Sequence, residues 1–366
     1  MPLTATTRSM LRLVCAVVVL AGASRLDWLS PRAGYTQDAG VAVELTTVPA
    51  REDIRPDGEP ARVTLRALLR GTPLPGGQLT LRLTAPPRST VLSTDFPHVE
   101  GTPLLVFTTL LPEDGTITFD YVFPIRGVYT VALDLAPLPG GPAFRSTSLH
   151  TTLAIAEAPE EVRNAWLLVL GLFVLGLFVG HVFARSAAAR DAVPSRVLLL
   201  PGVLLGLLLA AASAVMAAPA HTHTPQEGQE AQTVYGSEGW AFQVRPQPAT
   251  ATVGQLVELT LALTHAHQEE EKVVFRTTLH TQGGTLTPQL QFFDGAPHRL
   301  TVTARPDTGA APTVAPLTVT QDLEVTALHP PLGVQLRLLL LLLGVLVIGM
   351  AVGFFGSSPF TQSRHP

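Results

Sequence analysis

The chain carries two different patterns of apolar and polar residues. In residues 40–157 and 240–328, short runs alternate apolar with polar positions, and Pro- or Gly-containing turns separate them. In residues 165–184, 197–218 and 338–355 the apolar positions are nearly continuous. Alternation with a period of two is typical of half-buried strands. About 20 apolar residues are enough for a helix to cross a hydrocarbon core of ~30 Å. The pattern therefore predicts two β-rich segments and three membrane helices.

Each β-rich segment divides into several short strands. Along 61–69, Val63, Leu65 and Ala67 share one face while Thr64 and Arg66 occupy the other. Regular spacing of such strands favours antiparallel β-sandwiches. The strands expected from this alternation are 61–69, 77–86, 116–123, 128–135 and 150–156 in the first segment, and 257–263, 272–280, 285–293, 298–304 and 317–325 in the second.

The two β segments also resemble each other. Residues 106–133 can be aligned with residues 274–302, and after the first few positions the alignment needs no gap. The matching positions include Thr109 with Thr278, Gly115 with Gly284, Phe123 with Phe292, and Tyr129 with His298. An internal repeat of this kind predicts a duplicated unit of sandwich followed by helix.

Basic residues orient the predicted helices. Arg8 and Arg12 precede an apolar run that ends in small residues, which predicts a secretory signal peptide cleaved after Ala23. The loop 185–196 carries three arginines and one aspartate, so the positive-inside rule makes it cytoplasmic. Both β segments are then external. The expected layout is a signal peptide at 1–23, an external sandwich at 24–163, helices at 164–184 and 197–218 around the loop 185–196, a linker at 219–239, a second external sandwich at 240–330, a helix at 334–355 and a cytoplasmic tail at 356–366.

Composition agrees with a membrane protein and excludes several classes of function. Apolar residues make up 46% of the chain, charged residues only 14%, and the mean hydropathy is +0.33. The net charge of −4 leaves no broad basic surface for nucleic acid. Cys15 is the single cysteine, so no intramolecular disulfide or cysteine-rich zinc site can form. The sequence has no serine-hydrolase elbow, zinc-protease motif or phosphate-binding glycine loop, which argues against an enzyme.

The stretch GVYTVAL (127–133) resembles the entry to a late strand of bacterial immunoglobulin-like domains. The resemblance implies that Tyr129 closes a corner by hydrogen bonding to nearby backbone. A membrane-tethered domain of this kind with scattered histidines is also similar to YtkA-like and other copper-associated envelope proteins. The methionine-rich segments common among copper-handling proteins are missing, since Met216 and Met350 both lie in apolar runs.

Histidines are the candidate metal ligands. His265 and His267 continue the inward alternation of their strand and would lie about 6–7 Å apart at the rim of the sandwich. Neutral imidazoles at this spacing suit Cu²⁺ or Zn²⁺, but a solvated strand end explains the same residues. A second pair, His221 and His223, lies in the linker after the second helix and has the same two interpretations.

Two further histidines belong to the second sandwich. His298 takes the place of the corner residue Tyr129, which favours a structural role over metal ligation. His280 ends a strand and is expected to approach His298 rather than His265. These two residues form at most a weaker, second candidate for a metal site.

The sequence thus predicts a multi-pass protein of the bacterial inner membrane, with two all-β immunoglobulin-like sandwiches outside the membrane and three transmembrane α-helices. Gly171, Gly176 and Gly180 give one helix a side suited to close packing against another helix. The first functional hypothesis is a non-enzymatic binding or assembly module that docks an envelope or membrane protein beside the lipid bilayer. The alternative is capture or delivery of copper or zinc through the external His-x-His pairs.

Overall fold

The computed structural model describes residues 34–188 and 232–356, except for short gaps at 39, 57, 89–92, 95, 236–239, 250, 266–272, 276–278, 282–284, 294–296 and 307–316. The described residues belong to two compact units. The β unit draws on Pro31–Glu157 and Ala220–Pro330, and the helical unit on Ala158–Pro219 and Pro331–Pro366. The predicted signal peptide and the predicted helix 197–218 lie outside the described residues.

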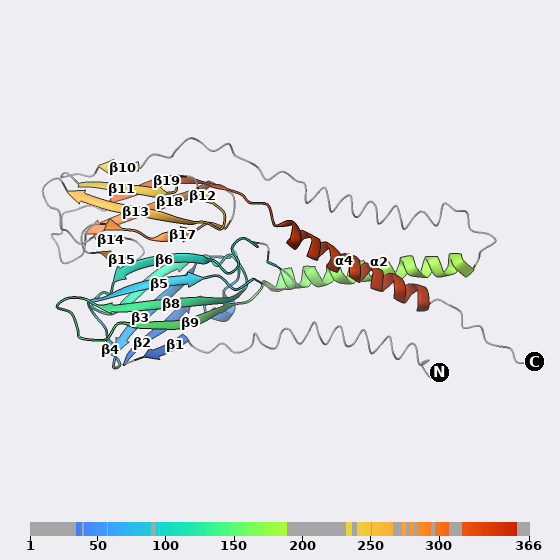
Figure 1. The fold of residues 1–366 in the computed structure, drawn as a ribbon, viewed down its shortest axis with the longest axis horizontal. Coiled ribbons are helices and arrows are strands. Elements are labelled where there is room, and N and C mark those ends of the chain that lie inside the picture. Colours follow the sequence, from blue (N-terminus) through green and yellow to red (C-terminus); the bar gives the residue numbers. More distant parts are fainter. Residues whose placement is uncertain are drawn as a thin grey trace, which may run out of the picture. The chain divides into compact units, whose positions relative to one another are not determined.

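The first half of the β unit is a sandwich of two antiparallel sheets (Figure 1). The strand order in the two sheets, given below, is that of an immunoglobulin-like sandwich whose second sheet has four strands. One sheet contains β1 (Gly34–Asp38), β2 (Val41–Val48), β3 (Ala61–Leu69), β4 (Thr72–Pro73) and β7 (Thr116–Tyr121), with β7 paired to β3. The other runs in the order β6 (Pro103–Leu110), β5 (Gly77–Thr84), β8 (Gly127–Pro137) and β9 (Thr147–Ile155). A short 3-10 helix, η2, covers Arg51–Asp53.

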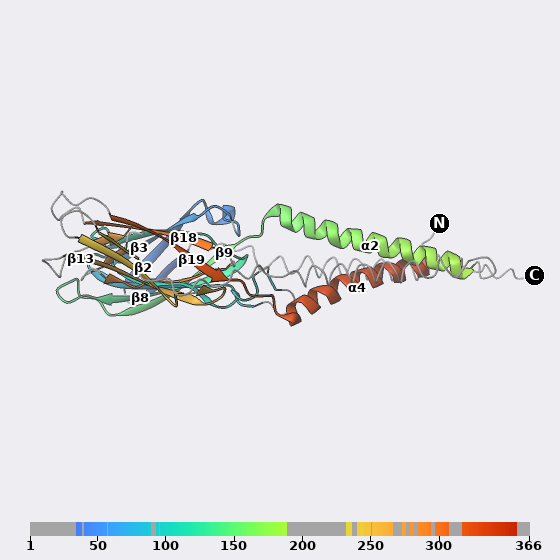
Figure 2. The same ribbon diagram turned by 90° about the horizontal axis from the view of Figure 1, so that it is seen from above.

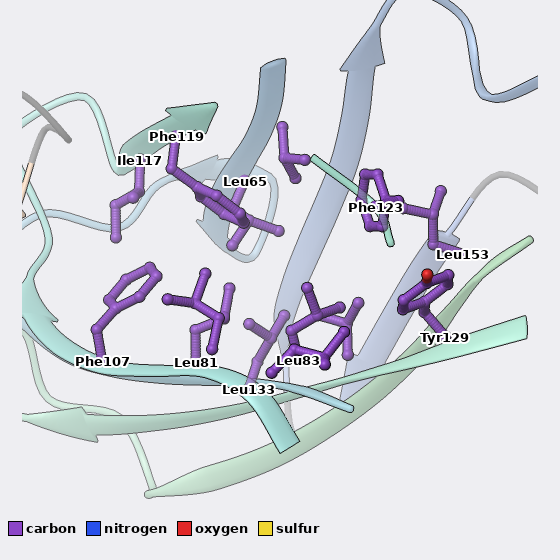
Figure 3. Close-up of a cluster of buried hydrophobic side chains, with 14 of the residues drawn as sticks. Leu65, Leu81, Leu83, Phe107, Ile117, Phe119, Phe123, Tyr129, Leu133 and Leu153 are labelled. Carbon is purple, nitrogen blue, oxygen red and sulfur yellow. The ribbon is translucent and has the colours of Figure 1, made fainter. Parts of the chain in front are cut away.

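The alternation seen in the sequence places the core between these sheets. In β3, Val63, Leu65 and Ala67 are all buried, while Arg62 and Arg66 are exposed. Side chains from the two sheets face each other across the core in Figure 3. They include Leu65, Ile117 and Phe119 from the first sheet and Leu81, Phe107 and Leu133 from the second.

The second half repeats this arrangement. One layer contains β10 (Gln232–Tyr235), β11 (Trp240–Gln247), β13 (Leu256–His265), β16 (Thr285–Leu286) and β17 (Gln289–Gln291), with β16 and β17 both paired to β13. The other contains β15 (Leu279–Thr281), β14 (Val273–Phe275), β18 (Pro297–Pro306), β19 (Leu317–Thr326) and β12 (Ala251–Thr252). In this layer β12 runs parallel to β19.

Strand pairing supports the internal repeat and corrects its first positions. The order β1–β2–β3–β7 in the first half matches β10–β11–β13–β16/β17 in the second. The predicted alignment, however, placed residues 106–108 of β6 over residues 274–276. That part is wrong, because β14 pairs with β18 in the way that β5 pairs with β8. The strand equivalent to β6 is β15, which pairs with β14 as β6 pairs with β5.

The two sandwich-like halves are joined, because β6 pairs with strands of both. On one side it pairs with β5, and on the other with β17, at Val106 opposite Gln289 and Leu105 opposite Leu290. Near its end, Leu110 also pairs with His280 of β15. A strand at the edge of a sheet presents unpaired backbone groups that can pair with another strand. Both predicted sandwiches thus belong to one compact β unit.

The helical unit contains two described helices, α2 (Pro159–Ala188) and α4 (Leu332–Gly356). They cross in Figure 1 and converge toward their C-terminal ends in Figure 2. Both are long and apolar enough to cross a membrane. Pro159 at the first position and two acidic residues in the first turn favour the start of α2, because proline needs no hydrogen-bond donor there and carboxylates favour a helix N-terminus. These residues explain why α2 begins several residues before the apolar run at 165.

Candidate functional site

The structure places only part of the predicted histidine site. His265 is the last residue of β13, opposite Trp240 of β11. His267, His221 and His223 lie outside the described residues. Among the residues that are described, no group of three or more His, Cys, Asp or Glu side chains could hold a metal ion.

His280 and His298 do not come together. His280 is opposite Val274 of β14, and Val274 is opposite Arg305, near the end of β18. His298 lies near the other end of β18, opposite Leu323. Seven residues of strand separate the two positions, roughly 23 Å at the usual rise per residue. The expected approach of His280 to His298 is therefore wrong, because β15 lies beside the far end of β18.

The corner residues of the two halves are built alike. The hydroxyl of Tyr129 donates to the carbonyl oxygen of Ile125 at 2.5 Å and accepts from the Ile125 N–H at 3.0 Å. Its ring meets Phe123 edge-on with centroids 5.0 Å apart, and Figure 3 shows the two rings together. Burial raises the pKa of Tyr129, so the hydroxyl stays protonated. The predicted tyrosine corner is confirmed.

His298 takes the equivalent position in the second half. Its ring packs against Phe292 with centroids 4.7 Å apart, just as Tyr129 packs against Phe123. This ring contact supports the interpretation of His298 as a structural replacement for the corner tyrosine.

Charged residues on the β unit form cross-strand pairs on outer sheet faces. Arg62 of β3 bonds Asp120 of β7 at 3.0 Å, and Arg299 of β18 bonds Asp322 of β19 at 2.9 Å. The hydrogen bond from Arg299 lowers the pKa of Asp322. All four side chains are more than half exposed, so they are solvated pairs of small energetic weight. Neither pair is buried, as the groups of an acid–base site usually are.

The junction between the halves has its own contacts beside the β6 pairing. We define it as residues 93–106 with residues 254, 289–293 and 329. Phe96 meets Phe293 edge-on with centroids 5.6 Å apart, and His98 Nε2 donates to the carbonyl oxygen of His329 at 2.8 Å. Gly254 has φ of +82° and lies against His98 so closely that a side chain there would contact the His98 carbonyl oxygen. Glycine is therefore favoured both by conformation and by space.

Two buried polar residues stabilise the junction. Glu100 Oε1 accepts from the backbone N–H of Thr94 at 2.6 Å, and its other oxygen lies 3.6 Å from Arg88 Nε. Gln291 is bonded through Oε1 to the hydroxyl of Thr102 at 3.0 Å. Burying such groups is costly unless they are paired. The bond between Thr102 and Gln291 needs both halves in place, so it links them specifically, whereas both partners of Glu100 belong to the first half.

Glycines form the closest contact of the helical unit. We call Gly176 and Gly180 of α2 with Gly349 and Gly353 of α4 the glycine seam. A Cβ atom at any of these four positions would overlap a backbone oxygen of the other helix. Small residues four apart let helix backbones approach this closely. The partner predicted for α2 is thus α4 of the same chain, whereas Gly171 lies outside the seam, with no atom within 4 Å of where its Cβ would be.

Comparison with known proteins finds no related sequence and only a weak structural likeness. No protein-family profile matches the chain, and no curated protein matches it in sequence. Similar solved structures include the D0-D1 domain of intimin, at 10% identity and a TM-score of 0.20 over 80% of this chain and 99% of that one. The Escherichia coli adhesin FdeC matches at 14% identity and 0.19, over 80% of this chain and 65% of that one. Invasin, described as a bacterial integrin-binding protein, matches at 13% and 0.19, over 79% of this chain and 40% of that one. The assignment as an immunoglobulin-like β-sandwich therefore depends on the strand pairings described above.

Proposed function

We propose that the chain is a non-enzymatic, multi-pass protein of the bacterial inner membrane whose β unit binds and assembles envelope proteins on the periplasmic side. The observation that supports this most is the double pairing of β6, which makes one body of the two halves. A single body presents its outer sheet faces to a partner in a fixed relation, and fixed surfaces lose less conformational entropy on binding.

The outer faces of the β unit are suited to a soluble, specific contact. On β8 and β9, the cross-strand pair Thr130 and Thr152 is exposed, next to Ala132 and His150. Large apolar side chains with substantial exposure are few among the described strands and loops of the unit: Val48, Val128 and Leu328. Partner binding would accordingly use polar sheet faces, edges and loops rather than one large apolar patch.

A photo-crosslinking experiment on the full-length protein in membranes tests this function. A photoreactive residue is placed at Thr130 or Thr152 on the outer face of one sheet. In a matched control it is placed at Thr46, on the outer face of the opposite sheet. If one of these faces binds a partner, probes on that sheet give one adduct of defined mass and probes on the other sheet give none. For the β8–β9 face, the adduct from a probe at Thr152 should disappear in the variant Thr130→Arg. If exposed strand positions on both sheets give no discrete adduct, the β unit is not a binding module.

No observation on the described residues favours metal capture over this function. The alternative keeps its own test, since copper or zinc binding through His265, His267, His221 and His223 is measured directly by titration. That measurement does not depend on the crosslinking result.

A further inference from the structure

The chain leaves the β unit for both helices at the same end of the unit, which we call the exit end. Strand β9 ends there at Ile155, beside the start of β8, and β5 also ends beside the start of β8. Strand β19 ends next to the loop from β5 to β6, because the carbonyl oxygen of His329 accepts from His98 Nε2 in that loop at 2.8 Å. The short helix η2, which follows β2, lies beside β9. The exit end comprises residues 48–56, 84–88, 96–103, 123–128, 154–157 and 326–330.

The exit end carries the exposed apolar side chains of the β unit. Among the described residues of the unit, the large apolar side chains with substantial exposure are Val48, Val128 and Leu328, and Val48 is 69% exposed. Val48 ends β2 and is followed by Pro49 and Ala50, which are exposed as well. Val128 is the second residue of β8, and Leu328 lies two residues after β19. The apolar exposure of the described β unit is therefore confined to one end.

Short connections keep the exit end close to any membrane that the helices enter. Three residues, 156–158, connect β9 to α2, and five residues, 327–331, connect β19 to α4. Fully extended, such connections reach at most roughly 11 and 18 Å. Each helix then has six residues before its apolar run, 159–164 in α2 and 332–337 in α4. Six helical residues span about 9 Å, whereas the headgroup layer on one side of a bilayer is roughly 5–8 Å thick.

We propose that, given the membrane insertion proposed above, the exit end contacts the lipid headgroups of the periplasmic leaflet, with Val48 and Leu328 at the boundary of the hydrocarbon core. Exposed apolar side chains gathered in one place mark surfaces that bind a membrane or another protein. The two connections favour the membrane here, because they hold its surface next to the exit end at an effective concentration that no diffusing protein has. The sheet faces and the far end of the β unit are then left to protein partners.

Fluorescence quenching of the full-length protein in lipid nanodiscs tests the proposal. Cys15→Ser removes the native cysteine, and an environment-sensitive label is attached through Val48→Cys or, as the matched control, Glu113→Cys. Glu113 is exposed in the turn between β6 and β7, at the far end of the unit, roughly 30 Å away along the length of β8. The nanodiscs contain phosphatidylethanolamine and phosphatidylglycerol, with or without a lipid that carries a nitroxide quencher on its headgroup. Iodide in the buffer measures exposure to water.

The expected result is lipid quenching several-fold stronger at position 48 than at position 113, with iodide quenching in the opposite order. Adding Leu328→Asp should reduce the lipid quenching at position 48, because a carboxylate is disfavoured at the hydrocarbon boundary. Leu328 is exposed, so this change leaves the core of the β unit intact.

Equal lipid quenching at positions 48 and 113, or no change in Leu328→Asp, overturns the proposal. A label at position 48 that neither quencher reaches also overturns it, because a protein then covers the exit end. Release of the protein from native membranes by alkaline carbonate would instead contradict the proposed membrane function, which separates the two failures.

Discussion

Replacing Tyr129 with phenylalanine isolates the contribution of the corner hydrogen bonds. The variant keeps the aromatic ring and its edge-on contact with Phe123 but removes the hydroxyl, which both donates to and accepts from Ile125. Ile125 is 2% exposed, so its N–H and carbonyl oxygen would lose a partner inside the protein. Leaving buried groups unpaired costs about 1–3 kcal/mol, and we expect Tyr129→Phe to lower the free energy of unfolding by about 2 kcal/mol.

Urea unfolding of the full-length protein in detergent, followed by the β-sheet signal in circular dichroism, measures this loss. With a denaturant dependence of about 1–3 kcal/mol per molar urea, the midpoint should fall by roughly 1 M. Tyr121→Phe is the matched control, because Tyr121 packs on the same Phe123 ring and no described residue hydrogen bonds to its hydroxyl. Equal midpoints for Tyr129→Phe and the native protein, or an equal loss in the control, would refute the reasoning.

Four further outcomes are expected. Gly349→Leu should weaken the packing of α2 on α4 by about 1–2 kcal/mol and reduce crosslinking between Leu177→Cys and Met350→Cys, whereas Gly344→Leu, where no atom lies within 4 Å of the added Cβ, should not. Phe293→Ala should destabilise the junction by about 1 kcal/mol or more through loss of the edge-on contact with Phe96, measured as a lower unfolding temperature, with Val128→Ala as the surface control. Calorimetric titration of Cu²⁺ and Zn²⁺ into the untagged protein tests the histidine site: binding that disappears in the double variant His265→Ala, His267→Ala assigns metal capture, and absence of binding assigns a polar strand end. Because burial raises the pKa of Tyr129, the neutral form stabilises the fold at pH values below about 10, and stability should fall as pH rises above that value, less steeply in Tyr129→Phe.

Local pattern was enough to predict the strands β3, β5, β7, β8, β9, β13, β18 and β19 and both described helices, but it merged β14 with β15 and β16 with β17. The alternation of 61–69 gave the bounds of β3, and the apolar runs indicated α2 and α4. The tyrosine corner followed from the short stretch GVYTVAL, because a large aromatic residue at that point of the strand has a defined backbone partner. The repeat placed His298 at the corresponding position, where its ring packs against Phe292.

Contacts between distant segments could not be predicted from local sequence pattern. The pairing of β6 with β17 is made by backbone groups, which leave no trace in side-chain alternation. The position of His280 depended on whether its strand is equivalent to β5 or to β6, and strands of similar composition do not distinguish these alternatives. The partner of Gly176 and Gly180 could have been found, since GMAVG at 349–353 has the same spacing of glycines.

The shared strand β6 also imposes an order on assembly as the polypeptide is made. The first half contains every strand of its own two sheets before residue 156, so its ladders can close while the rest of the chain is still being synthesised. Strand β17 finds its second neighbour only if β6 is already in place. Domains made first generally fold first during synthesis, and here the earlier half is a template for the later one. If the order of the halves along the gene were exchanged, every residue would be preserved, but β17 would be made before the strand β6 with which it pairs.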